Sequence, residues 1–227
     1  MCGRFALAFV KGFFTRFEVL DQSAKVEPRF NIAPSQTVPI VLSESPNRVV
    51  QMKWGLVPFW AKDPKIGNRL INARAEGISK KPAFRTSVKR KRCIVPATGF
   101  FEWRRADGRK VPYYVHLKDN DFFAFAGLWD SWKDPDGKEL LTFTIVTTTP
   151  NAMMSRIHDR MPVMLRREDE ALWLEHRPLE DDELKRLFKP YPARPMGAYE
   201  VSAEVNNPRN ERQALIEPVA HALGDLA

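Results

Sequence analysis

The feature that most constrains the fold is a succession of short strand-like segments through the middle of the chain. Seven segments are rich in β-branched and aromatic residues and are bounded by Pro, Gly, Asn or Asp: residues 38–42, 49–54, 93–96, 100–104, 113–117, 122–129 and 141–147. Short segments of this composition, separated by turn-forming residues, are typical of β-strands. Residues 12–20, 168–176 and 181–188 instead show the apolar spacing of helices.

These patterns predict an α+β fold. We expect a β-rich single domain, residues 1–227, with a curled, barrel-like antiparallel sheet and peripheral helices. The sequence contains neither an internal repeat nor a Gly/Ser linker that would divide it. Its 227 residues, 44% of them hydrophobic, are enough to bury a sizeable core.

Charge is distributed unevenly along the chain. Lys and Arg total 36 against 28 acids, a net charge of +8. Residues 168–183 are mostly acidic, whereas residues 80–92 contain no acid and carry Lys80, Lys81, Arg85, Lys89, Arg90, Lys91 and Arg92. A basic body with one acidic edge is typical of a protein that binds a polyanion, although a basic run is also a common solvated surface.

The remaining composition narrows the class of protein. Two cysteines, Cys2 and Cys93, argue against a disulfide framework, and the sequence has no His/Cys cluster with zinc spacing. We therefore expect no metal and no cofactor. No apolar run approaches the ~20 residues needed to span a membrane, and Arg4 interrupts the only stretch that could resemble a signal peptide. These observations predict a cytoplasmic protein with no membrane partner.

The start of the chain, Met1-Cys2-Gly3-Arg4, holds the most reactive candidate group. Removal of Met1 would leave Cys2 with an α-amine of pKa ~8 and a thiol of pKa ~8.5. This 1,2-aminothiol can condense with an aldehyde to an imine, and the thiol can then close a five-membered thiazolidine. An internal cysteine cannot do this. The alternative interpretation is an inert buried cysteine, a common state for free Cys.

Two further segments place polar groups in unusual settings. Asn72 precedes Arg74, which can fork onto a phosphate, but Asn72 could also cap a helix beginning near Ala73. Glu102 lies in a run of aromatic residues, and strand alternation places it on the face of Phe100. If that face is buried, desolvation suits Glu102 to proton transfer near neutral pH; otherwise it is an exposed edge-strand carboxylate.

One histidine stands out from the other three. His116 lies in a strand, His176 follows the acidic helix and His221 is in the C-terminal tail. His158 lies in a polar turn with Arg160 two residues later. A histidine in such a turn can transfer protons near neutrality, and a structural role fits the pattern equally well.

The ordered set of motifs resembles the SOS-response-associated peptidase family of abasic-site-processing proteins, over nearly the whole chain. The motifs are Met1-Cys2-Gly3-Arg4-Phe5, Phe30-Asn31-Ile32-Ala33-Pro34, Trp54-Gly55-Leu56-Val57-Pro58, Asn72-Ala73-Arg74-Ala75-Glu76, Arg92-Cys93-Ile94-Val95-Pro96, Gly99-Phe100-Phe101-Glu102-Trp103, Ala126-Gly127-Leu128-Trp129 and Ile157-His158-Asp159-Arg160-Met161-Pro162. Phe30 and Phe101 stand where the family pattern often has tyrosine, and neither change removes a proposed catalytic group.

The resemblance implies a DNA-binding protein with a catalytic centre. Cys2 would match the family's nucleophile, Asn72 and Glu102 the groups around its amine, and His158 the group facing the opened sugar. The residues implied to bind DNA are Arg4, Asn31, Pro34, Trp60, Arg74, Trp103, Thr147 and Arg160. The implied partner is single-stranded DNA with abasic sites, which would bring the protein to the nucleoid; replication-fork proteins are further candidate partners, and the chain is expected to be a monomer.

The implied activity is a covalent thiazolidine crosslink that shields the lesion during replication. The resemblance also implies removal of the residues before the cysteine, as a thiol autopeptidase, and a weak abasic-site lyase activity. Because Met1 alone precedes Cys2 in this sequence, an ordinary aminopeptidase could do the first step. Two other functions remain open: an N-terminal-nucleophile amidohydrolase, for which no glutamine-pocket motif is found, and a noncovalent single-strand-binding module.

Overall fold

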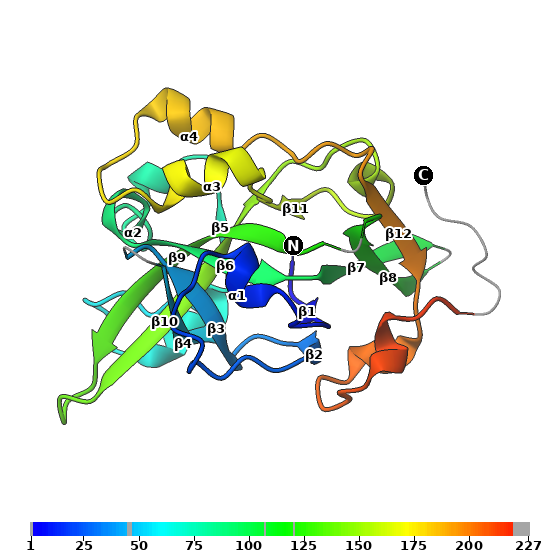
Figure 1. Cartoon of the computed structure of the whole chain (residues 1–227), viewed down its shortest axis with the longest axis horizontal. Helices are drawn as coiled ribbons and strands as arrows, with labels where there is room; N and C mark the ends of the chain where they lie inside the picture. Colours follow the sequence, from blue (N-terminus) through cyan, green and yellow to red (C-terminus); the bar gives the residue numbers. More distant parts are fainter. Residues whose placement is uncertain (1, 45–46, 107, 120, 220–227) are drawn as a thin grey trace.

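The computed structural model describes residues 2–44, 47–106, 108–119 and 121–219 (Figure 1). Met1, which the proposed chemistry requires to be removed, and His221 lie outside the described residues. The strands are β1 (Phe5–Leu7), β2 (Arg29–Ile32), β3 (Thr37–Leu42), β4 (Arg48–Trp54), β5 (Asn72–Arg74), β6 (Arg92–Ala97), β7 (Gly99–Ala106), β8 (Arg109–Leu117), β9 (Phe123–Lys133), β10 (Glu139–Thr148), β11 (Met161–Pro162) and β12 (Met196–Glu200).

The helices are short and lie between or after the strands. The α-helices are α1 (Phe13–Arg16), α2 (Ser87–Arg90), α3 (Arg167–Leu174) and α4 (Asp181–Leu187). The 3₁₀ helices are η1 (Pro64–Arg69), η2 (Ile78–Lys80), η3 (Met154–Arg156), η4 (Ala203–Asn206) and η5 (Gln213–Ile216). All seven predicted strand segments are strands, so the predicted β-rich α+β class is confirmed.

Five strands close into a barrel. The order β10–β4–β3–β6–β9 is completed by pairing of β9 with β10 along seven residues, from Glu139 opposite Lys133 to Ile145 opposite Gly127. The predicted antiparallel pairing holds for β3 with β4 and β6, and for β9 with β6 and β10, whereas the pairings of β10 with β4 and with β5 are parallel. A closed barrel has no unpaired edge, so its interior can be filled by alternate side chains of every strand.

A second sheet, of order β12–β8–β7–β1–β2, packs beside the barrel. Strand β1 connects the two units, because it pairs with β7 while the backbone N–H of Thr98 donates to the Ala6 carbonyl at 2.8 Å. Figure 1 shows the start of the chain between the barrel and this second sheet. Cys2 therefore enters the molecule where the two sheets meet.

Helices α2, α3 and α4 lie together over one side of the barrel (Figure 1). Arg92, counted in the basic run, is only 5% exposed and does not face solvent. Its guanidinium donates to the carbonyl oxygens of Val88, Lys89, Trp173, Glu175 and Arg177. The basic run and the acidic segment are thus held together through backbone carbonyls, because a buried guanidinium requires hydrogen-bond acceptors for its donors.

Two predicted helices keep their positions and one is much shorter. The segments predicted at 168–176 and 181–188 are α3 and α4, whereas residues 12–20 contain only the four-residue α1. Glu18 has a left-handed φ of 54°, which ends any continuation of that helix. Among the described residues, no helix is long and apolar enough to cross a membrane.

Candidate functional site

Cys2 is fully buried at the junction of the two sheets. Its Sγ lies 3.9 Å from the Arg4 carbonyl oxygen, and its own carbonyl oxygen accepts a hydrogen bond from Asn72 Nδ2 at 2.8 Å. Burial, and then the charge of Glu102, raise the pKa of the Cys2 thiol far above its ordinary range. The thiol is therefore protonated near neutral pH, and its nucleophilicity is suppressed in this state.

Asn72 is positioned by the barrel. It begins β5, where it lies opposite Ile145 of β10 in a parallel pairing. The alternative prediction, in which Asn72 caps a helix, is wrong because residues 72–74 are extended. Asn72 Nδ2 is used by Cys2, whereas Oδ1 is buried and has no hydrogen-bond partner among the described residues. An acceptor is therefore available beside the Cys2 backbone.

Glu102 faces the interior from the middle of β7. It is only 2% exposed, so the alternative of an exposed edge carboxylate is wrong. Phe100 belongs to the main core, whereas Phe101 and Trp103 pack in a second cluster on the opposite face, as the alternation predicted. Glu102 Oε2 lies 4.0 Å from His158 Nε2, so the two groups are one short movement from hydrogen-bond distance.

His158 has a partner for each of its protonation states. The backbone N–H of Arg160 lies 3.0 Å from Nδ1, which fits a neutral ring with its proton on Nε2, toward Glu102. Asp159 Oδ1 lies 2.9 Å from the same Nδ1, which fits a ring with a proton on Nδ1, as in the protonated ring or the other neutral tautomer. A side chain whose two forms are both accommodated is suited to proton transfer.

The structure therefore brings four predicted residues together from four separate segments. Cys2 precedes β1, Asn72 begins β5, Glu102 is in β7 and His158 lies between η3 and β11. Cys2 contacts Asn72 directly, and Glu102 acts on the Cys2 thiol through its charge and lies near His158. A buried thiol, a carboxylate, an amide and an imidazole at one point form a candidate site for nucleophilic and acid–base chemistry.

Comparison with known proteins decides the family. The family described as "SOS response associated peptidase (SRAP)" matches residues 1–208. The chain belongs to the SRAP family. It is 45% identical over 228 residues to the abasic site processing protein YoqW of Bacillus subtilis (strain 168), with 96% of this chain and 99% of that protein covered.

More distant relatives and solved structures agree. The abasic site processing protein HMCES of Xenopus tropicalis is 32% identical over 221 residues, covering 83% of this chain and 65% of that protein. A crystal structure of a protein from Bacteroides thetaiotaomicron superposes with a TM-score of 0.86 at 31% identity, covering 96% of this chain and 99% of that one. A structure from Bordetella bronchiseptica has a TM-score of 0.76 at 23% identity over 89% of this chain and all of that one, a likeness of fold.

Two arginines of this SRAP chain lie beside the candidate site. Arg74 ends β5 and is exposed. Arg160 is 11% exposed and donates from both terminal nitrogens to the two carboxylate oxygens of Glu76, at 2.6 and 2.9 Å. Its Nη2 also donates to the carbonyl oxygen of Thr147 at 2.7 Å. Thr147 itself is fully buried, and its contact with DNA stays a prediction.

Arg4 and Asn31 are committed to contacts inside the protein. Asn31 is 0% exposed, and its Nδ2 lies within hydrogen-bond distance of the carbonyl oxygens of Val205, Asn207 and Asn210. Arg4 Nη1 donates to Asn31 Oδ1 at 2.7 Å and to the Val205 carbonyl at 2.6 Å. Asn31 is completely buried in this structure, and its contact with DNA stays a prediction.

The Arg4–Asn31 pair positions a tryptophan. The two side chains hold η4 and the residue that follows it, and Asn206, the last residue of η4, accepts a hydrogen bond from Trp103 Nε1 at 2.8 Å. Trp103 is half-buried, so part of its ring stays accessible. Pro34 lies in the turn after β2, next to Ser35, whose φ is +72°.

A loop after β4 carries an aromatic residue that sequence reasoning missed. Trp60, which was predicted to bind DNA, is 48% exposed, and its neighbour Phe59 is 57% exposed. The loop is anchored because the Phe59 N–H donates to the buried carboxylate of Asp130 at 3.0 Å. Lys91 pairs with the same carboxylate at 2.6 Å. The available sequence signal was the pair of adjacent aromatic residues at the end of Val57-Pro58-Phe59-Trp60.

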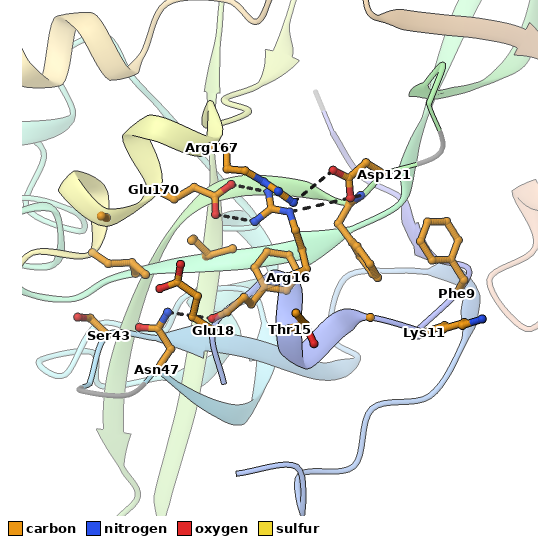
Figure 2. Close-up of a pocket in the computed structure, with 16 residues that line it drawn as sticks. Phe9, Lys11, Thr15, Arg16, Glu18, Ser43, Asn47, Asp121, Arg167 and Glu170 are labelled. Carbon is orange, nitrogen blue, oxygen red and sulfur yellow. Dashed lines mark hydrogen bonds and ion pairs between the residues drawn. The ribbon is translucent and has the colours of Figure 1, made fainter. Parts of the chain in front are cut away.

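A separate cavity of about 760 Å³ contains none of the predicted site residues (Figure 2). Arg16 and Glu170 form a bidentate pair at its wall, with distances of 2.8 and 2.5 Å. Asp121 lies 4.0 Å from Arg16 Nε and 3.4 Å from Arg167. The charges lining this cavity balance one another, so it lacks the positive potential that a polyanion requires. Within the described ranges, no cluster of His, Cys, Asp and Glu could hold a metal ion.

Proposed function

We propose that this protein recognises abasic sites in single-stranded DNA and bonds to them covalently through Cys2, once Met1 has been removed. The observation that carries the proposal is the meeting of Cys2, Asn72, Glu102 and His158 at one buried point. Relatives named abasic site processing proteins support the substrate class.

The chemistry of an N-terminal cysteine favours a defined order of bond formation. Burial and the charge of Glu102 raise the pKa of the Cys2 thiol while Met1 is present. Removal of Met1 frees the α-amine, which acts first because only an amine forms the imine that the thiol then closes. The amine attacks the C1′ aldehyde of the opened sugar and forms a carbinolamine, which loses water to give an imine. The S–H then adds across the C=N bond: sulfur bonds to C1′, the proton moves to nitrogen, and a thiazolidine results.

Each neighbouring side chain has a defined role in this sequence. His158 moves the proton needed to open the cyclic sugar, with Nε2 directed toward Glu102. Glu102 transfers protons when the carbinolamine loses water and in the reverse reaction. Asn72 holds the Cys2 backbone through Nδ2 and offers Oδ1 to the amine or to a sugar hydroxyl. General acid–base catalysis of this kind contributes roughly 10²–10⁴-fold.

DNA binding is mainly electrostatic in this proposal. Exposed Arg74 contacts a phosphate beside the lesion, and Arg160 provides a second phosphate contact. The rings of Trp60 and Trp103 pack against bases or the exposed sugar, and Pro34 shapes the adjoining wall. Arg4 and Asn31 support Trp103, and Thr147 supports Arg160 through its carbonyl oxygen.

The test is a crosslinking assay with single-stranded DNA that contains one abasic site. The wild-type protein should give an adduct that survives a denaturing gel, and its intact mass should equal the protein without Met1 plus the DNA, less one water. Cys2→Ala should give no heat-stable adduct while it keeps most of its noncovalent affinity. Cys2→Ser keeps the amine, so its adduct should be labile and should become stable after borohydride reduction.

Cys93→Ala is the matched control. Cys93 is also a fully buried cysteine, but it lies in β6 and has no free amine. It should crosslink like the wild type. A full-yield, heat-stable adduct from Cys2→Ala would exclude the proposed nucleophile. Release of ammonia from glutamine, without any DNA adduct, would favour an amidohydrolase. Cleavage of the DNA strand at the lesion would reveal the lyase side activity, because the imine also allows β-elimination.

A further inference from the structure

The pairing of Arg160 with Glu76 occupies the part of the guanidinium that a phosphate would use. Both carboxylate oxygens of Glu76 accept hydrogen bonds from the two terminal nitrogens of Arg160, at 2.6 and 2.9 Å. This two-point geometry is the one in which arginine binds phosphate. The same hydrogen bonds hold the pKa of Glu76 below its ordinary range, so the carboxylate stays charged near neutral pH.

The two members of the pair differ in how firmly they are held. Arg160 is 11% exposed, and its Nη2 is also bound to the Thr147 carbonyl at 2.7 Å. The Glu76 side chain is 56% exposed and lies in the turn between β5 and η2. An incoming anion can therefore replace Glu76, the more exposed partner, while Arg160 stays in place. The Arg160 backbone N–H meanwhile remains on His158 Nδ1, at 3.0 Å.

We propose that Glu76 is a built-in competitor of the DNA phosphate for Arg160. The inference rests on the proposed function, because it concerns the same DNA-binding site. In the free protein Glu76 orients the guanidinium and neutralises its charge. DNA must exchange a phosphate for the carboxylate, and this lowers the affinity for any single strand. Arg74, which is exposed, then makes the first phosphate contact.

The proposal makes a specific prediction for Glu76→Gln. Glutamine keeps the shape of the side chain and one acceptor but removes the charge, so the phosphate no longer competes with an anion. Affinity for an intact single strand without an abasic site should rise about fivefold, within the range expected for a partly exposed ion pair. The slope of log K against log salt concentration should become steeper by up to about 0.7, because one more positive charge of the protein pairs with a DNA phosphate.

Two further variants separate this mechanism from a general change of charge. Glu183→Gln, on α4, removes the same charge from another two-point Arg–Glu pair, with Arg177 at 2.8 and 2.7 Å, outside the candidate site. It should change affinity by less than twofold. In the Arg160→Gln background, Glu76→Gln should not raise the affinity for DNA, because the arginine whose charge Glu76 neutralises is gone. Fluorescence anisotropy over a salt series measures all of these constants.

Two outcomes would overturn the proposal. One is that Glu76→Gln binds intact DNA no more tightly than Glu183→Gln, which would mean that Glu76 only stabilises the folded structure. The other is that the gain persists without Arg160. Because this DNA has no abasic site, failure of the wild type to crosslink in the previous assay would overturn the proposed function without affecting this comparison.

Discussion

At the residue scale, the proton positions of Glu102 and His158 are central to the proposed chemistry. The 4.0 Å between Glu102 Oε2 and His158 Nε2 is too long for a hydrogen bond, but a sugar oxygen beside the pair could lie within hydrogen-bond distance of both atoms. His158 Nδ1 is turned away, toward the Arg160 backbone and Asp159. A carboxylate whose charge acts on the Cys2 thiol and an imidazole next to that carboxylate can therefore act at different steps.

We predict that Glu102→Gln and His158→Ala fail at different steps. Glutamine keeps the shape of glutamate but cannot transfer a proton, so Glu102→Gln should slow crosslink formation and reversal at least tenfold, or ~1.4 kcal/mol of barrier. His158→Ala should be slow on a natural abasic site and less impaired toward a small pre-formed aldehyde, which needs no ring opening. Quenched-flow crosslinking of both variants against both substrates measures this difference.

The opposite pattern is equally informative. Equal impairment of His158→Ala on the two substrates would remove its ring-opening role. If the crosslinking rate of each variant falls less than tenfold, most of the catalysis comes from holding the sugar next to Cys2 in the DNA groove.

At the element scale, the loop between β4 and η1 turns aromatic rings outward because its backbone is tied inward. Gly55 has a φ of +123°, and a Cβ there would lie 2.7 Å from the Gly67 carbonyl oxygen, so the position requires glycine. The Val57 N–H donates to Thr142 Oγ1 at 2.8 Å. The Phe59 N–H is bound to the buried carboxylate of Asp130, so the loop backbone is held at the barrel while the rings of Phe59 and Trp60 stay exposed.

This loop predicts a stacking role for Phe59 beside Trp60. Phe59→Ala should weaken binding to an intact single strand about five- to tenfold, since base–aromatic stacking contributes about 1–3 kcal/mol per base. Phe59→Tyr keeps the ring and should bind like the wild type. Leu20→Ala is a control for loss of an exposed apolar side chain, because Leu20 is 76% exposed and lies on another segment. Equal anisotropy titrations for Phe59→Ala and Phe59→Tyr would contradict the stacking role.

At the scale of the whole molecule, the closed barrel and second sheet bury several groups that ionise at high pH. Burial raises the pKa of the thiols of Cys2 and Cys93 and of the Tyr114 phenol. A group whose pKa is raised by folding contributes stability that is complete below its unfolded-state pKa. That contribution falls as pH rises toward the folded-state pKa. Stability should therefore decline above the ordinary thiol value of 9.0.

Cys93→Ala tests this alkaline sensitivity. The variant should be less stable than the wild type near neutral pH, because the Cys93 Sγ fills space against Gly127. Between about pH 9.5 and 10.5, however, its free energy of unfolding should fall less steeply, by about 1.4 kcal/mol per pH unit, since one titrating group has been removed. Urea unfolding at a series of pH values measures both effects. Parallel curves for the two proteins would show that folding does not raise the pKa of Cys93.

The sequence by itself determined the properties that depend on local chemistry. Alternation along residues 100–104 placed Glu102 on the face of Phe100, and the composition of the seven segments predicted the strands. The position of Cys2 next to Met1 identified the one residue that could carry both an amine and a thiol. Such conclusions succeed because side-chain direction in a strand and the reactivity of a chain end are set within a few residues.

Only the tertiary structure decided which groups meet and what charge they present. Asn72 proved to be extended because β5 pairs with β10, a partner more than 70 residues away along the chain. Arg160 and Arg92 look alike as bases in the sequence, yet one is neutralised by Glu76 and the other is buried among carbonyl oxygens. The effect of a charge depends on its partners and its solvation, and chain segments far apart in sequence supply both.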